Sequence, residues 1–481
     1  MRLMKNSIAL LLGNGLSRVI EYLLIFILVR LLSDDDYVLY RQYILILATF
    51  LPFIIGGTAI TFGYYNAKCN TQEKAYVFFN TFIILLIQGA FGFLIFFLLK
   101  NLISDYYGNP NIQKIAIYVS FILFFQTIYS FYSFYLIEKN KAKKLVIINV
   151  IYAAIKFSII IILTINNISM ENIIFGLVFL NCAYAIFSVA DAMIQNKNYK
   201  HNFKPNVKPY IIYSSKVYIS QVSYALTETI DKNIVSNTMS NFSYAVYSNG
   251  AFANPLTPLL LSSINSVMYP EYTKLVDQGH KLEVIELWKK TISISAMILI
   301  PLAFALIVFA KPIVILLFTD KYSASVPYFI IYQLSVIFGL TYFGTLYNVV
   351  NSTLKYVYRV VSTLVITIFL LYFLSLTKNM LYIAFGALLM KAIAFVLNIQ
   401  GISKIYKINF FHSYPFRNQI IIILCCTLIS LGFYTVNYFI HTTNTFQFIQ
   451  LFIMLIIEYG IIALIFFNRI KEYVNLFRKD M

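Results

Sequence analysis

The segment SIALLLGNGLSRVIEYLLIFILVRL, residues 7–31, is apolar for most of its length but contains Asn14, Arg18 and Glu21. A helix needs about 20 mostly apolar residues to cross a bilayer. The segment is too long for the apolar region of a signal peptide and has no small-residue cleavage site, so we expect a retained first transmembrane helix. The three polar residues are spaced i, i+4, i+7 and share one face of that helix.

Apolar stretches of this kind recur along all 481 residues, from 7–31 to 446–467. Hydrophobic residues make up 60% of the chain and charged residues 12%, against about 25% charged residues in a typical soluble domain. A soluble fold could not bury that much apolar surface, and only helices or closed barrels satisfy their backbone in lipid. The sequence therefore predicts an all-α polytopic membrane protein with about 14 transmembrane helices.

The net charge of +18 is explained by the positions of the bases. Alternate loops, together with both termini, hold most of the 37 lysines and arginines, whereas the opposite loops hold only Lys100, Lys114, Lys321 and Lys378. Cytoplasmic loops carry the excess of bases in membrane proteins. We therefore expect both termini to be cytoplasmic, and the basic composition does not indicate a nucleic-acid partner.

An internal repeat relates the two halves. A shift of about 207 residues places LSDDDYVLY at 32–40 on MSNFSYAVY at 239–247 and Glu21 on Glu228. The shift moves six spans, so the orientation in the membrane is kept and the repeat is parallel. We predict two six-helix lobes plus two C-terminal helices, with an N-lobe at 1–195, a basic linker at 196–210, a C-lobe at 211–402, and the last two helices with a basic tail at 403–481.

Ionisable residues inside spans are costly and mark functional sites by default. The span at 211–236 is far more polar than its neighbours and, with the first span, is predicted to line an aqueous cleft between the lobes. A cationic cleft suits an anionic head group. The alternatives are that Arg18 only pairs with Glu21 at i, i+3 and that Lys156 snorkels. The predicted substrate-cavity residues are Asn14, Arg18, Lys156, Lys216 and Lys391.

Four further residues are predicted to serve ion coupling or a gate: Glu21, Glu228, Asp231 and Lys232. Neighbouring carboxylates raise the cost of ionising both, so Glu228 and Asp231 are the candidates for a proton or sodium site, whereas Arg18 is expected to keep Glu21 ionised. The lone charges Lys391 and Glu458 are expected to be paired within the bundle. No bound cofactor is expected beyond such an ion.

Motifs for catalysis and for metal binding are absent from the sequence. The chain has no GxxxxGK[ST], HExxH or GxSxG pattern, and its four cysteines do not have the spacing of a zinc site. We therefore predict a transporter without catalytic or metal-binding residues. A membrane enzyme, such as a polysaccharide polymerase, would need a substantial outer loop with catalytic groups.

Several short segments resemble one family. Arg30–Leu31–Leu32 ends the first span and an acidic turn leads to Tyr37–Val38–Leu39–Tyr40, where the family has Tyr-Gly-x-Tyr. Asp231–Lys232 stands where the family often has Asp-Arg, and PEYTKLVDQG at 270–279 and FTDKYSASVPYFII at 318–331 match later loops. The chain resembles Wzx-type O-antigen and capsular polysaccharide flippases, the polysaccharide transporter branch of the multidrug/oligosaccharidyl-lipid/polysaccharide exporter superfamily.

The resemblance implies a function in the bacterial inner (cytoplasmic) membrane. The implied substrate is an oligosaccharide on undecaprenyl diphosphate, moved by alternating access from the cytoplasmic to the periplasmic leaflet. A polysaccharide polymerase and a chain-length regulator are the implied protein partners. A cation-coupled multidrug antiporter and a lipid II flippase of the same superfamily remain alternatives at this point.

Overall fold

The computed structural model describes residues 2–68, 74–139, 141–195, 208–252, 254, 256–440 and 444–467. Over these ranges the chain is built from helices joined by short turns, and no strand occurs in them. Contacts divide the chain into two compact units. The first comprises Leu12–Ala245 with Leu364–Ile368, and the second comprises Val246–Thr363 and Phe369–Met481 with Met1–Leu11.

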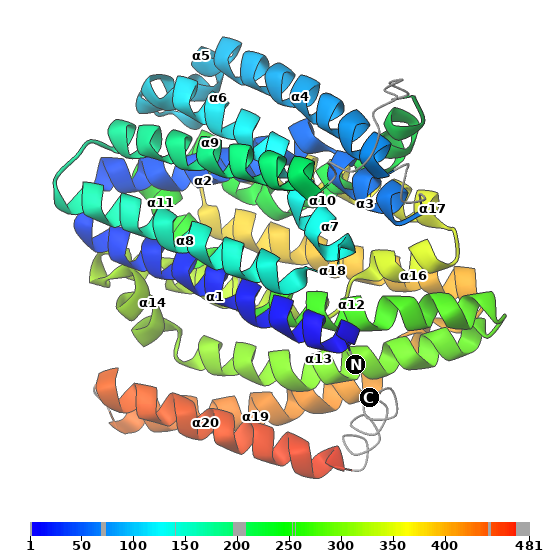
Figure 1. The fold of residues 1–481 in the computed structure, drawn as a ribbon. Helices are drawn as coiled ribbons and strands as arrows, with labels where there is room; N and C mark the ends of the chain where they lie inside the picture. Colours follow the sequence, from blue (N-terminus) through cyan, green and yellow to red (C-terminus); the bar gives the residue numbers. More distant parts are fainter. Residues whose placement is uncertain are drawn as a thin grey trace. The chain divides into compact units, whose positions relative to one another are not determined.

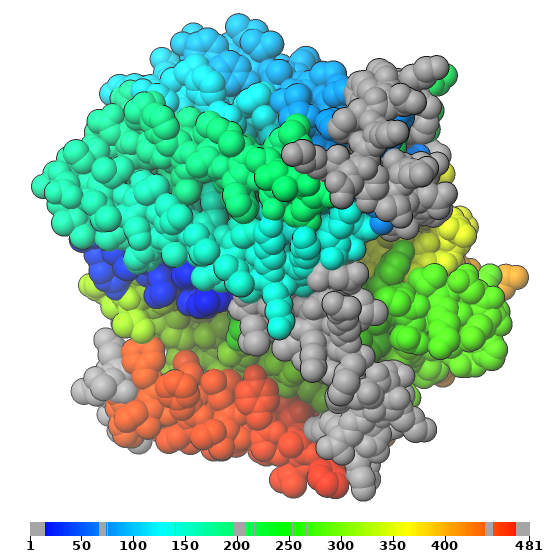
Figure 2. All heavy atoms as spheres, in the orientation of Figure 1, coloured from blue at the N-terminus to red at the C-terminus, as the bar shows by residue number. Residues whose placement is uncertain are grey.

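In the first unit, α6 packs between α4 and α9, while α10 packs against α2, α3 and α5 (Figure 1). Figure 2 shows α8 and α9 covering one face of this unit. Both helices carry exposed apolar side chains, such as Ile151 and Phe179, as expected of helices in lipid. The helices are α1 (Arg2–Leu31), α2 (Asp34–Ile55), α3 (Thr58–Lys68), α4 (Lys74–Leu98), α5 (Lys100–Tyr107), α6 (Asn111–Tyr129), α7 (Tyr132–Glu138), α8 (Ala142–Ile165), α9 (Met170–Gln195) and α10 (Lys208–Thr238).

In the second unit, α13 packs against α12, α15, α19 and α20 around the buried Trp288. The α-helices are α11 (Asn241–Gly250), which begins in the first unit, α12 (Leu256–Asp277), α13 (Lys281–Val308), α14 (Ala310–Phe318), α15 (Val326–Leu334), α16 (Phe343–Val349), α17 (Thr353–Ser375), α18 (Met380–Tyr406), α19 (Phe416–Ile440) and α20 (Asn444–Ile465). Short 3-10 helices are η1 (Asp320–Ser325), η2 (Ser335–Phe338) and η3 (Phe410–His412).

Eleven helical segments of the described residues are long and apolar enough to cross a membrane. The chain is therefore a multi-pass, all-helical membrane protein, as predicted. The eleven do not include α1, α10 or the pair α11 and α12. Helix α10 is rich in polar residues, and the pair is interrupted between Gly250 and Leu256. The count of about 14 stays a prediction, although each predicted stretch falls on a helix or an interrupted helix.

Helix boundaries and caps recur at the predicted offset of 207 residues, whereas the parallel two-lobe arrangement stays a prediction. Adding 207 to the end of α1 at Leu31 gives the end of α10 at Thr238, and adding it to the start of α4 at Lys74 gives the start of α13 at Lys281. The caps repeat as well, since the Ser33 hydroxyl accepts from the Asp36 backbone N–H at 3.3 Å and the Ser240 hydroxyl accepts from that of Ser243 at 3.2 Å. These bonds satisfy the first N–H groups of α2 and α11.

The contact units divide at Ala245 because α10 packs against α2 and α3. The lobes at 1–195 and 211–402 and the segment 403–481 stay a prediction, and residues 196–207 of the predicted linker lie outside the described residues.

A close approach of α10 accounts for the interruption between α2 and α3. Gly56 has φ +54°, and a Cβ atom there would lie 2.1 Å from the Tyr218 ring. The Tyr218 hydroxyl donates to the Phe53 carbonyl at 3.0 Å, which satisfies a carbonyl near the end of α2. Only glycine fits this backbone at this distance, so the sequence Gly56–Gly57 positions α10 against α2 and α3.

Candidate functional site

A cluster of charged side chains lies on α1, α2 and α8 of the first unit, and we call it the basic site: Arg18, Glu21, Arg41 and Lys156. The Lys156 ammonium lies 3.7 Å from a Glu21 carboxylate oxygen, which joins α8 to α1. Arg18, Glu21 and Arg41 all lie within electrostatic range of the Tyr22 hydroxyl. Arg41 and Lys156 are likewise close to the Tyr40 hydroxyl. The basic site thus holds three cations and one carboxylate.

Tyrosines surround the lysine of the basic site. The hydroxyls of Tyr40, Tyr43 and Tyr152 lie within electrostatic range of the Lys156 ammonium, and Tyr40 and Tyr43 are almost fully buried. The Tyr152 hydroxyl also donates to Asn181 Oδ1 at 3.1 Å. Apart from Glu21, the groups facing Lys156 are therefore neutral phenols, which offer hydrogen bonds but no compensating charge.

Burial differs between the partners of the ion pair. The Lys156 side chain is 22% exposed, whereas that of Glu21 is 49% exposed. An excess of positive charge in a low-dielectric wall attracts anions strongly, and intramembrane charges usually face protein or a water-filled cavity. The arrangement can bind an anion, and it offers no nucleophile–base pair for catalysis.

The predicted Arg18–Glu21 pair is wrong. Glu21 pairs with Lys156 on α8 instead, and Arg18 lies beside Tyr22, one turn further along α1. Arg41 and the tyrosines were missed in the sequence, although Tyr40 belongs to the motif that precedes Arg41. Lys156 also does not extend its ammonium to the membrane surface by snorkelling, because the ammonium lies among groups of α1, α2 and α8.

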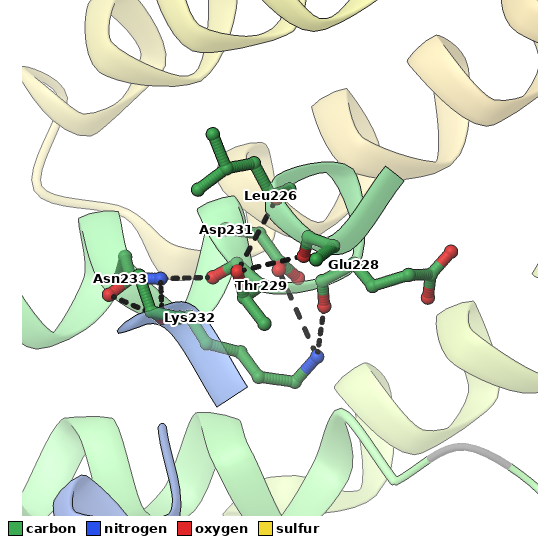
Figure 3. Close-up of polar contacts among 8 residues, drawn as sticks. Leu226, Glu228, Thr229, Asp231, Lys232 and Asn233 are labelled. Atoms are coloured by element: carbon green, nitrogen blue, oxygen red, sulfur yellow. Dashed lines mark hydrogen bonds and ion pairs between the residues drawn. The ribbon is translucent and has the colours of Figure 1, made fainter. Parts of the chain in front are cut away.

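The charged residues of α10 form a second cluster (Figure 3). The Lys232 ammonium lies 3.9 Å from Asp231 Oδ1 and donates to the Glu228 carbonyl at 3.1 Å. The Asp231 side chain is only 5% exposed, whereas Glu228 is exposed and Figure 3 shows its carboxylate extending away from the Lys232 ammonium. Asp231 is thus the buried carboxylate of this cluster.

Beside this cluster, hydrogen bonds join α10 to α2 and α5, and we call their side chains the polar latch: Gln42, Tyr107, Asn109, Asn233 and Ser236. The Gln42 amide donates to the Tyr107 carbonyl at 3.0 Å and to the Ser236 hydroxyl at 3.1 Å, and it accepts from the Asn109 amide at 2.6 Å. The latch residues are all buried. Each buried polar group is therefore paired across helices, which rigidifies this end of the unit.

Asn233 connects the latch to the rest of α10. The Tyr107 hydroxyl donates to Asn233 Oδ1 at 2.7 Å, and the Asn233 amide donates to the Thr49 hydroxyl at 3.0 Å and to the Thr229 carbonyl at 2.9 Å. Burial raises the pKa of Tyr107, so the phenol stays protonated and keeps its role as donor. The one signal for these pairings that is visible in the sequence is the presence of amides in apolar helices.

Other predicted residues are not brought to the basic site by the described structure. Asn14 and Lys216 lie on α1 and α10, but their side chains lie outside the described residues. Lys391 lies in the second unit, with its ammonium 5.7 Å from the Tyr332 ring centroid. Glu458 is fully buried on α20 beside Cys426, and its expected partner stays a prediction.

Metal-binding groups are absent from the described residues. Within the described ranges, no three His, Cys, Asp or Glu side chains lie close enough together to bind one. The candidate chemistry of the described residues is therefore that of anion binding and of interhelical hydrogen bonding.

Comparisons with known proteins bear on the family and on the fold. A family model described as polysaccharide biosynthesis protein matches residues 27–327. The lipid II flippase MurJ in an inward closed conformation superimposes with a TM-score of 0.74 at 15% identity, covering 96% of this chain and 99% of that one. The curated proteins contain no match.

Two other solved structures share the fold with lower scores. A MATE in complex with MaD3S has a TM-score of 0.59 at 15% identity, covering 84% of this chain and 96% of that one. A multidrug/oligosaccharidyl-lipid/polysaccharide exporter superfamily transporter from Pyrococcus furiosus has a TM-score of 0.59 at 14% identity, covering 82% and 93%. At such identities the likeness establishes the fold alone.

Proposed function

Because the chain belongs to the polysaccharide biosynthesis protein family, we propose that it is a flippase for an undecaprenyl-diphosphate-linked oligosaccharide. It moves the repeat unit from the cytoplasmic to the periplasmic leaflet of the bacterial inner membrane, for O-antigen or capsular polysaccharide assembly. Both termini are cytoplasmic in this proposal, and the polymerase and chain-length regulator receive the product.

The observation that carries the proposal is the composition of the basic site. In the described part of the chain, Arg18, Arg41 and Lys156 lie around the Glu21 carboxylate, among tyrosines. The diphosphate of a lipid carrier has the negative charge that complements these bases, and a guanidinium group can bind two phosphate oxygens at once. A cationic drug would be repelled by the same residues, which disfavours a multidrug antiporter.

A lipid II flippase would use the same diphosphate, so the basic site alone does not favour one glycan. The family match supports a polysaccharide repeat unit instead. Ion coupling is part of the proposal: Asp231, buried beside Lys232, takes up and releases a proton or sodium ion. The polar latch closes and opens one end of the path during alternating access.

The test uses cells that assemble a surface glycan. Arg18→Ala and Lys156→Met should abolish the surface glycan, with lipid-linked repeat units accumulating inside, while the protein still reaches the membrane. Arg18→Lys should restore transport only in part, since an ammonium lacks the guanidinium fork. Lys143→Ala is the matched control, because Lys143 is an exposed lysine on the same helix as Lys156. Normal surface glycan in both basic-site variants would reject the proposed role.

A further inference from the structure

The ion pair within the basic site is loose. Its N···O distance of 3.7 Å exceeds the roughly 2.7–2.9 Å of a charge-assisted hydrogen bond. Glu21 is the more exposed partner, and Lys156 is held deeper among tyrosines. Moving the Glu21 carboxylate into water therefore costs less free energy than moving the Lys156 ammonium out of its surroundings.

The groups that face Lys156 come from three helices. Tyr40 and Tyr43 of α2 and Tyr152 of α8 contribute neutral phenols, and Glu21 of α1 contributes the single opposite charge. Two anions beside one ammonium repel each other, which raises the cost of keeping both ionised and in place. A phosphate group and the Glu21 carboxylate therefore compete for Lys156.

We infer that Glu21 is a built-in competitor for the anionic head group. In the empty protein its carboxylate occupies Lys156, and the diphosphate displaces it when the substrate binds. The displacement breaks the ion pair that joins α1 to α8, so binding of the anion is coupled to the release of α1. The inference rests on the proposed function and adds to it a switch that keeps the site occupied until the substrate arrives.

The proposed competition predicts that removal of the Glu21 carboxylate strengthens anion binding. Removing a charged residue from a binding site normally weakens binding, but removing the competitor strengthens it. Glu21→Gln should tighten the binding of a diphosphate by about threefold to tenfold, because a partly exposed ion pair must otherwise be broken. Glu21→Asp, whose shorter side chain reaches less far, should tighten binding by a smaller factor.

The experiment measures dissociation constants with the full-length protein in lipid nanodiscs by titration calorimetry. The probes are farnesyl diphosphate and inorganic diphosphate, which separate recognition of the anion from recognition of a prenyl chain. The variants are Glu21→Gln, Glu21→Asp, Lys156→Gln and the double variant. Asp105→Asn is the matched control, because it removes an exposed carboxylate of the same unit elsewhere.

We expect Glu21→Gln to tighten binding of both probes and Lys156→Gln to weaken it. The double variant should lose the tighter binding seen in Glu21→Gln, since the two residues act on one interaction. If wild type binds a diphosphate but Glu21→Gln binds it no better than Asp105→Asn does, the competitor role is overturned while the proposed function stands. If neither wild type nor Glu21→Gln binds either probe, the basic site is not an anion site and both proposals fail.

Discussion

Replacement of Gln42 by leucine tests whether the polar latch holds α2, α5 and α10 together. Gln42 is fully buried, and its amide donates to the Tyr107 carbonyl and the Ser236 hydroxyl while accepting from Asn109. Leucine has a similar volume, so the change removes hydrogen bonds without opening a large cavity. Each buried group left without its partner costs about 1–3 kcal/mol.

Two or three such groups lose a partner, so the latch should weaken by roughly 2–5 kcal/mol, after allowing for partial relaxation. A difference of about 1.4 kcal/mol is tenfold in an equilibrium constant. Local opening at this end of the unit should therefore become at least about thirtyfold more frequent. The effect should be local, because the latch connects helix ends rather than the core of the unit.

Hydrogen–deuterium exchange in nanodiscs measures this opening. Peptides that cover α5 and the turn between α10 and α11 should exchange faster in Gln42→Leu, whereas peptides from α8 should not change. Ser120→Ala is the control, since Ser120 is also buried but its hydroxyl bonds within its own helix, to Ala116. Equal exchange in Gln42→Leu and Ser120→Ala would refute the assigned role of the latch.

Three further predictions follow from other parts of the chain. Gly56→Ala should lower the melting temperature and displace α10, because φ is +54° and the new Cβ would meet the Tyr218 ring; unchanged stability would contradict the close approach. Asp231→Asn should remove the response of transport to an ion gradient in proteoliposomes, whereas Glu228→Gln should keep it because Glu228 is exposed; a normal response in Asp231→Asn would place coupling elsewhere. A cysteine at Lys200 should be labelled by an impermeant reagent only after permeabilisation, and labelling of intact cells would overturn the predicted topology.

The repeat and the helical stretches could be predicted from sequence because their signals are local. Apolar length identifies a span, and the offset of 207 aligns Ser33 with Ser240, whose hydroxyls cap α2 and α11 in the same way. The acidic residues after Ser33 form the first turn of α2, where negative charge is favourable at a helix N-terminus.

Partners across helices could not be predicted in the same way. The spacing of Arg18 and Glu21 permits a pair on one helix, but the rotation of α8 brings Lys156 to Glu21, and no local pattern encodes that rotation. Gln42 and Asn233 are single amides in separate helices, and both bond to Tyr107 at the end of the short helix α5. A polar residue in a span predicts that it has a partner, but its position in sequence does not reveal which one.

The matching caps and helix boundaries also bear on which changes the chain can accept. The interval from Leu31 to Lys74 has the same length as the interval from Thr238 to Lys281. Side chains within the two intervals differ, as the acidic residues after Ser33 and the neutral residues after Ser240 illustrate. The two intervals therefore share length more closely than composition, and engineered insertions between these helices should be tolerated less well than substitutions.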